Sequence, residues 1–118
     1  MKILYLEDDP GVNRAISGLL RAKGHLVTSY HSARPAIDHL EEVGPDVVVS
    51  DWHLEAGTAA AFIRRAATHC PVVVFSGAPE CVDRDILDLP NVSTLAKPST
   101  AEVIFRTIET AQAGGTRP

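Results

Sequence analysis

Polar residues that could do chemistry follow four short apolar runs of this sequence. An acidic triplet follows the first run, and a single aspartate comes directly after the second, a run of three valines and a serine. A serine follows the third run, and a lysine follows the last. Carboxylates, a hydroxyl and an ammonium in one place could bind a divalent cation and stabilise the charge of a phosphoryl group during its transfer. The four groups are Glu7-Asp8-Asp9, Asp51, Ser76 and Lys97.

The apolar runs have the pattern of strands that are buried in a parallel sheet. Val47 to Val49 form an unbroken β-branched run after Gly44-Pro45, and such runs are typical of central strands covered on both faces. In open α/β sheets the carboxyl ends of the strands form one edge, and ligands bind there. We therefore expect the four polar groups to meet in one cleft, with Asp51 as a phosphoryl acceptor.

Strand and helix patterns alternate five times along the chain. Apolar residues at helical spacing from Val12 to Leu20 form the predicted buried stripe of the first helix, which Asp9 caps and Gly24 ends. The residues from Ser99 to Glu102 predict a capping box for the last helix. Because crossovers between parallel strands are right-handed, we expect an α/β fold with one doubly wound, five-stranded parallel sheet and helices on both faces. The strands are predicted at Ile3–Leu6, Leu26–Tyr30, Val47–Ser50, Pro71–Phe75 and Val92–Ala96.

Length and composition indicate one domain that acts without nucleic acid or a membrane. The 118 residues can bury one core, and we assign residues 1–113 to a single domain and 114–118 to a flexible tail. The net charge is −4 and the only adjacent basic pair is Arg64-Arg65, so the basic footprint of a nucleic-acid binder is missing. No apolar run approaches the roughly 20 residues of a membrane span. Cys70 and Cys81 are too far apart for a CxxC motif and are expected as free thiols.

The predicted cleft favours magnesium. Carboxylates that are packed closely repel one another and raise each other's pKa, and a divalent cation removes the repulsion. Ligands that are all oxygen atoms favour Mg²⁺ over zinc. Taken alone, the acidic triplet could also be a set of helix N-terminal acids that complement the helix dipole, the role we assign to Asp9.

Four motifs in the expected order resemble the receiver domain of two-component response regulators, the chemotaxis-protein-like family. The resemblance extends from about Lys2 to Ala113 and implies a flavodoxin-like fold with strand order 2-1-3-4-5. Each motif is weak alone, and together they are specific. The motifs are Ile-Leu-Tyr-Leu-Glu-Asp-Asp, Pro-Asp-Val-Val-Val-Ser-Asp-Trp, Val-Val-Val-Phe-Ser-Gly-Ala and Leu-Ala-Lys-Pro.

The resemblance implies a role for each matched residue. Asp51 takes the place of the phosphoacceptor, and Lys97 takes the place of the lysine that contacts the phosphoryl group. Ser76 would bond a phosphate oxygen and move inward as one switch residue, and Thr94 occupies the second switch position. Mg²⁺ would be held by side chains and by one backbone carbonyl. These ligands are Glu7, Asp8, Asp51 and the carbonyl of His53.

The implied function is signalling rather than enzymatic turnover. A histidine kinase or a histidine phosphotransfer protein would phosphorylate Asp51, with Mg²⁺-dependent self-phosphorylation and autodephosphorylation as the only chemistry of the domain. Phosphorylation would shift the face formed by the fourth helix, fifth strand and fifth helix, which a downstream protein or a second copy of the chain would contact. Output would pass through protein contacts, phosphate relay or a region outside this chain. The expected location is the cytoplasm.

Departures from the family pattern keep two alternatives open. Thr94 stands where most receivers carry an aromatic residue, Glu55 replaces the proline common after the acceptor loop, and Ser99 replaces the usual phenylalanine after Lys-Pro. Residues 80–87 give only a weak helix signal. A pseudo-receiver that serves as a docking or dimerisation module is therefore one alternative. A metal-dependent phosphohydrolase is the other, but such enzymes usually carry a second acid where this chain has His53.

Overall fold

The computed structural model describes residues 1–55 and 57–114, and these contain the predicted parallel sheet. Five strands lie in the order β2-β1-β3-β6-β7, and every neighbouring pair is parallel. Counted along this sheet alone, the order is the predicted 2-1-3-4-5, and the doubly wound α/β fold is confirmed. The strands are β1 (Lys2–Leu6), β2 (Leu26–Tyr30), β3 (Val47–Asp51), β6 (Val72–Ser76) and β7 (Val92–Ala96).

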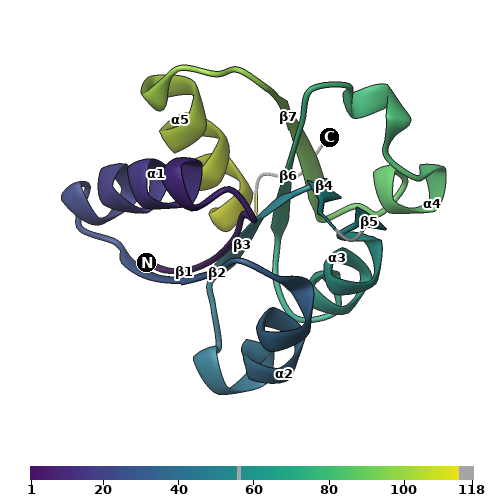
Figure 1. Ribbon diagram of the computed structural model, residues 1–118, viewed down its shortest axis with the longest axis horizontal. Helices are drawn as coiled ribbons and strands as arrows, with labels where there is room; N and C mark the ends of the chain where they lie inside the picture. The colour runs from purple at the N-terminus through teal and green to yellow at the C-terminus, as the bar shows by residue number, and fades with distance from the viewer. Residues whose placement is uncertain (56, 115–118) are drawn as a thin grey trace.

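Helices cover both faces of the sheet, with α1 (Pro10–Ala22) and α5 (Ala101–Gln112) on one side (Figure 1). On the other side lie α2 (Ala33–Val43) and α3 (Ala60–Ala67). Side chains of β3 alternate between two cores: Val47 and Val49 pack beneath α1 and α5, whereas Val48 packs beneath α2 and α3. The central strands β3 and β6 are buried along their whole length, as their apolar runs predict. None of the helices in the described ranges is long and apolar enough to cross a membrane.

The helix ends agree with the sequence signals at the start of the chain and differ at its end. Asp9 caps α1 by accepting a hydrogen bond from the Val12 N–H at 3.0 Å. The predicted capping box at Ser99 is wrong, because Thr100 is the cap of α5 and accepts from the Val103 N–H at 3.2 Å. The Ser99 hydroxyl instead donates to the carbonyl of Ala96, which holds it outside the helix.

The buried face of α1 also differs from the predicted apolar stripe. Val12 and Leu19 are 39% and 42% exposed, whereas the buried residues of the helix are Asn13, Ser17 and Leu20. Helical periodicity predicts which positions of a helix are buried, but polar side chains can occupy these positions when they have hydrogen-bond partners. Asn13 and Ser17 have such partners at the carboxyl edge of the sheet.

Short elements replace regular structure after β3 and β6. A hairpin that was not predicted, β4 (His53–Leu54) and β5 (Gly57–Thr58), follows β3. The weak helix signal after β6 corresponds to a 3₁₀ turn, η1 (Pro79–Cys81), and a single turn of helix, α4 (Arg84–Leu87). Arg64 of α3 anchors that segment through ion pairs to Asp83 at 3.0 Å and Asp85 at 2.8 Å.

The two thiols are free, as predicted, with Cys70 buried and Cys81 exposed. Burial raises the pKa of the Cys70 thiol to about 11, so it stays protonated at neutral pH. Of the predicted tail, only Gly114 belongs to the described residues, and 115–118 lie outside them.

Candidate functional site

Three carboxylates meet at the carboxyl edge of the sheet. Glu7 and Asp8 follow β1, and Asp51 is the last residue of β3, the strand that pairs with β1. One carboxylate oxygen from each of the three residues lies within 4.8 Å of the others. Glu7 is 2% exposed and Asp51 is 6% exposed, so two negative charges are held close together with little access to water. The sequence prediction that these acids converge is confirmed by the geometry.

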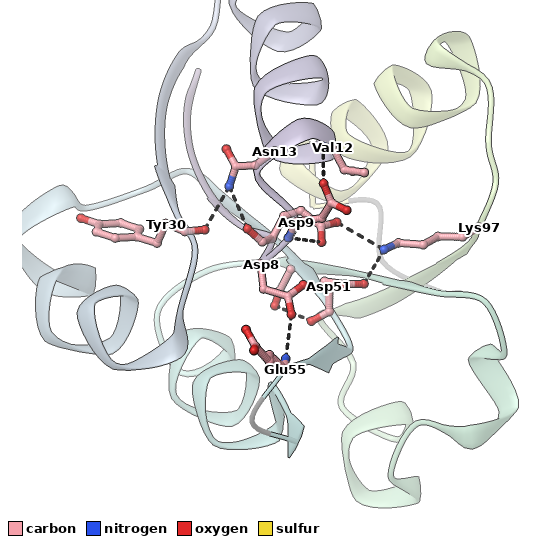
Figure 2. A network of polar contacts seen from close by, with 10 residues as sticks. Asp8, Asp9, Val12, Asn13, Tyr30, Asp51, Glu55 and Lys97 are labelled. Carbon is pink, nitrogen blue, oxygen red and sulfur yellow. Dashed lines mark hydrogen bonds and ion pairs between the residues drawn. The ribbon is translucent and has the colours of Figure 1, made fainter.

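Lys97 supplies the positive charge that this cluster needs. Its Nζ atom lies 2.6 Å from Oδ1 of Asp51 and 3.3 Å from Oε1 of Glu7, and Figure 2 shows the side chain reaching toward Asp51. Burial raises the pKa of Glu7, and the charge of Asp51 adds to the increase, while Lys97 opposes it. Burial lowers the pKa of Lys97, but its bonds and charge interactions with Asp51 and Glu7 raise it by more. The ammonium therefore remains charged between two carboxylates.

Asp8 and Asp9 leave the first strand in different directions and have different partners (Figure 2). Asp8 accepts a hydrogen bond from the Glu55 N–H at 2.7 Å, which ties the end of β4 to the acidic cluster. Asp9 is occupied as the cap of α1. Only two residues of the acidic triplet are thus available at the cleft.

The remaining predicted residues belong to β4, β6 and β7. Ser76 is 1% exposed at the end of β6, and its Oγ atom accepts a hydrogen bond from the Ala78 N–H at 3.1 Å. Thr94 is half-buried on β7 opposite Val74 of β6. His53 lies in β4 with an exposed side chain, directly after the buried Trp52. The ends of β3, β6 and β7 thus bring Asp51, Ser76 and Lys97 to one edge.

Asn13 is a site-supporting residue that the sequence interpretation missed. Its Nδ2 atom donates to the backbone carbonyls of Glu7 and Tyr30, each at 3.0 Å (Figure 2). Ser17 donates to Oδ1 of Asn13 at 3.2 Å, so both polar groups of the amide are used. The carbonyl of Glu7 belongs to the peptide bond between Glu7 and Asp8, and Asn13 therefore fixes the segment that presents both acids. Two polar residues four positions apart, inside the apolar stripe of α1, were the available signal.

Replacing Asn13 with alanine will weaken both folding and magnesium binding. Two carbonyls would lose their hydrogen bond from Asn13, which we expect to lower the free energy of unfolding by about 2 kcal/mol. The matched control is Ser17→Ala, which removes one hydrogen bond to the same amide and should cost about 1 kcal/mol. Urea unfolding measures both losses. Magnesium titration should show weaker affinity for Asn13→Ala than for Ser17→Ala, and equal affinities would contradict the positioning role.

Tyr5 is a second buried polar group beside the cluster. Its side chain is fully buried under α1 and α5, and among the described residues its hydroxyl has no hydrogen-bond partner. Burial raises the pKa of Tyr5, and the charges of Glu7 and Asp51 raise it further. The phenol therefore stays neutral and adds no charge to the carboxylates.

The acidic cluster fits a magnesium ion by its donor chemistry. Glu7, Asp8 and Asp51 offer only oxygen atoms, and two of the three carboxylates are buried. Hard divalent cations prefer such ligands, and a partly hydrated Mg²⁺ needs only a few protein oxygens. A single Lys97 ammonium balances part of the negative charge, which leaves the cluster with a net attraction for a cation.

The fold and the site together define a doubly wound α/β domain with an acidic cluster at the carboxyl edge of its sheet, and comparison with known proteins gives its family. The family model described as "Response regulator receiver domain" matches residues 3–109. The chain therefore belongs to the response regulator receiver family, whose members are signalling phosphoacceptors of two-component systems. Receiver domains interact with histidine kinases and phosphotransfer proteins. Comparison with curated proteins gave no match.

Solved structures of receiver domains share the fold at low sequence identity. The receiver domain of sensor histidine kinase PA1611 from Pseudomonas aeruginosa, with a magnesium ion in its active site cleft, is 22% identical with a TM-score of 0.82, covering 95% of this chain and 97% of that one. The N-terminal domain of a response regulator/sensory box/GGDEF protein from Carboxydothermus hydrogenoformans is 22% identical with a TM-score of 0.83. The match covers 96% of this chain and 94% of that one. Chemotaxis response regulator CheY4 of Vibrio cholerae is 18% identical with a TM-score of 0.78. The match covers 93% of this chain and 97% of that one.

Proposed function

We propose that this protein is a receiver that accepts a phosphoryl group on Asp51 from a histidine kinase or a histidine phosphotransfer protein. The observation that carries the proposal is the contact of Lys97 Nζ with Asp51 at 2.6 Å beside Glu7 and Asp8. The nucleophile, its counter-charge and a cation-binding set of oxygens thus share one edge of the sheet. We assign residues 1–113 to this receiver domain and 114–118 to a tail.

Each residue of the cleft has its own role in the proposed phosphoryl transfer. A carboxylate oxygen of Asp51 attacks phosphorus, the bond from phosphorus to the donor breaks, and the donor's leaving group takes the electron pair. Lys97 neutralises charge on the phosphoryl oxygens, which stabilises the transition state. The Ser76 hydroxyl then bonds a phosphate oxygen. When bound by Glu7, Asp8, Asp51 and the carbonyl of His53, Mg²⁺ would add positive charge at the same oxygens.

Phosphorylation would change the conformation of the face formed by α4, β7 and α5, and a partner would bind to that face. Ser76 ends β6 beside Ala96 of β7, and the Lys97 N–H donates to the Ser76 carbonyl at 3.0 Å, so movement of Ser76 acts directly on the end of β7. A downstream protein or a second copy of the chain would bind the conformer that phosphorylation favours. Thr94 is the switch residue proposed on β7. The cytoplasmic location also stays a prediction.

One observation favours the docking-module alternative. The output face combines Thr94, which cannot fill the space of an aromatic ring, with an α4 of one turn. Arg64 fixes that turn through two ion pairs, so the segment has an anchor that does not involve the phosphoacceptor. A module of this kind would keep the fold and bind its partner without phosphorylation.

Trp52 provides the measurement that separates the two functions. It is the only tryptophan, it follows Asp51 in the sequence, and its side chain is buried, with 2% of the residue exposed. Its backbone N–H donates to the Phe75 carbonyl at 2.9 Å. We expect its fluorescence to change saturably with Mg²⁺, and to change again with beryllium fluoride, a phosphoryl mimic. The second change should need Asp51. A folded protein that responds to neither ligand would favour the docking module.

A further inference from the structure

Positive charge is concentrated in the part of the chain that forms α1, β2 and the start of α2. Residues 10–37 contain four arginine or lysine residues, two histidines and no aspartate or glutamate. The whole chain has a net charge of −4, so this segment carries +4 and the remainder carries −8. Charge segregated in this way creates a local positive potential on an acidic protein.

Two arginines of α1 stand out because neither forms an ion pair with a carboxylate in the described part of the chain. Among the described residues, five arginines form ion pairs with aspartate or glutamate, and Arg14 and Arg21 are the two that do not. They are seven residues apart, which is about 10.5 Å along the helix and nearly the same side of it. The Arg21 guanidinium donates to the Val27 carbonyl at 3.0 Å and is thereby held over β2.

A polar pocket of about 230 Å³ lies between α1 and the end of β2. Its buried polar lining includes Asn13 and Ser17, which are 3% and 1% exposed, while the two unpaired arginines are exposed at its wall. At about 30 Å³ per water molecule, the volume suits a compact ion and is below the usual size of a pocket for a nucleoside or a drug-sized ligand. The polar residues that line it are Asn13, Arg14, Ser17, Arg21, Ser29 and His31.

We propose that this pocket binds a compact anion with two or more negative charges, such as a diphosphate group or a small dicarboxylate. Guanidinium groups bind phosphate and carboxylate oxygens in bidentate fashion. Because Arg14 and Arg21 have no carboxylate partner among the described residues, no ion pair has to break when they bind an anion. The hydroxyl of Ser29 adds a neutral donor. The site is separate from the carboxylates of the cleft and does not use Asp51, so it goes beyond the proposed phosphoacceptor function.

Amide NMR of the ¹⁵N-labelled full chain tests the proposal, with sodium pyrophosphate and sodium malonate as probes. Divalent cations are removed beforehand with a chelating resin, because pyrophosphate chelates magnesium and a soluble chelator such as EDTA is itself a polyanion. The buffer contains 0.15 M sodium chloride, because salt screens non-specific attraction. We expect saturable shifts at Arg14, Ser17, Ser29 and His31 with a Kd of about 1 mM or below. Tighter binding of pyrophosphate assigns a diphosphate ligand, tighter binding of malonate assigns a dicarboxylate, and either result supports the site.

Two double variants with the same net charge decide whether the arginines form the site. Arg14→Gln/Arg21→Gln should weaken the better probe about tenfold or more. Arg84→Gln/Arg106→Gln removes two arginines that lie outside residues 10–37 and already have carboxylate partners, and it should leave the affinity unchanged. Absence of saturation in the parent protein, or an equal loss in both double variants, would overturn the proposal. Circular dichroism confirms that each variant is folded.

Discussion

Asparagine in place of Asp51 will abolish phosphorylation of this protein by a small phosphodonor. The neutral amide is a poor nucleophile, and it also removes one of the three carboxylates that we assign to Mg²⁺. The fold should persist, because asparagine has nearly the same shape and Lys97 keeps its second partner, Glu7, at 3.3 Å. Intact-protein mass spectrometry after incubation with acetyl phosphate and Mg²⁺ should show a phosphoryl group on the parent protein and none on the variant.

Asp9→Asn is the matched control for the loss of Asp51. Asp9 also lies at the carboxyl edge of the sheet, but its carboxylate caps α1, a role that asparagine fills about equally well. The Asp9 variant should therefore be phosphorylated like the parent protein and unfold at nearly the same urea concentration. Phosphorylation of Asp51→Asn, or its loss in Asp9→Asn, would show that the acceptor has been assigned to the wrong carboxylate.

The sheet and the convergence of the site could be predicted because both follow from strand polarity. Once the apolar runs are parallel strands, their carboxyl ends share an edge, and the residues after them must lie together. Asp51, Ser76 and Lys97 reach the cleft in this way, although 25 and 21 residues separate them along the chain. The buried runs of β3 and β6 made the prediction secure because no helix boundary or capping signal was needed to place them.

The features that could not be predicted depend on the particular hydrogen-bond partners that side chains find in the folded chain. Asn13 is buried because the carbonyls of Glu7 and Tyr30 lie within its reach, and neither partner follows from the periodicity of α1. The cap of α5 moved from Ser99 to Thr100 because the Ser99 hydroxyl bonds Ala96 instead. Likewise, the sequence placed Lys97 at the cleft but could not show that it contacts two carboxylates at once.

Methionine in place of Lys97 will destabilise the magnesium-free protein and slow phosphorylation. The ammonium lies between the carboxylates of Asp51 and Glu7, and its removal leaves two buried like charges without compensation. Breaking a fully buried ion pair costs about 3–5 kcal/mol. The Lys97 side chain is 37% exposed, and solvent screens its charge, so we expect the free energy of unfolding to fall by about 2 kcal/mol. The loss of charge at the phosphoryl oxygens should slow phosphorylation by roughly 100-fold.

A double-mutant cycle with Glu7→Gln tests whether the destabilisation is electrostatic. Burial and the Asp51 charge both raise the pKa of Glu7, so the ionised Glu7 carboxylate is unfavourable at this position. In Lys97→Met, Glu7→Gln removes that charge and with it the repulsion between Glu7 and Asp51 that the ammonium no longer balances. Glu7→Gln should therefore restore about half of the stability lost in Lys97→Met, and millimolar Mg²⁺ should stabilise Lys97→Met as well. Lys2→Met makes the same chemical change at an exposed lysine and should alter stability by less than about 0.5 kcal/mol. A zero coupling energy between Lys97 and Glu7 would mean that the charge of Glu7 has no part in the stabilisation by Lys97, which leaves the contact with Asp51 and the packing of the aliphatic chain as its sources.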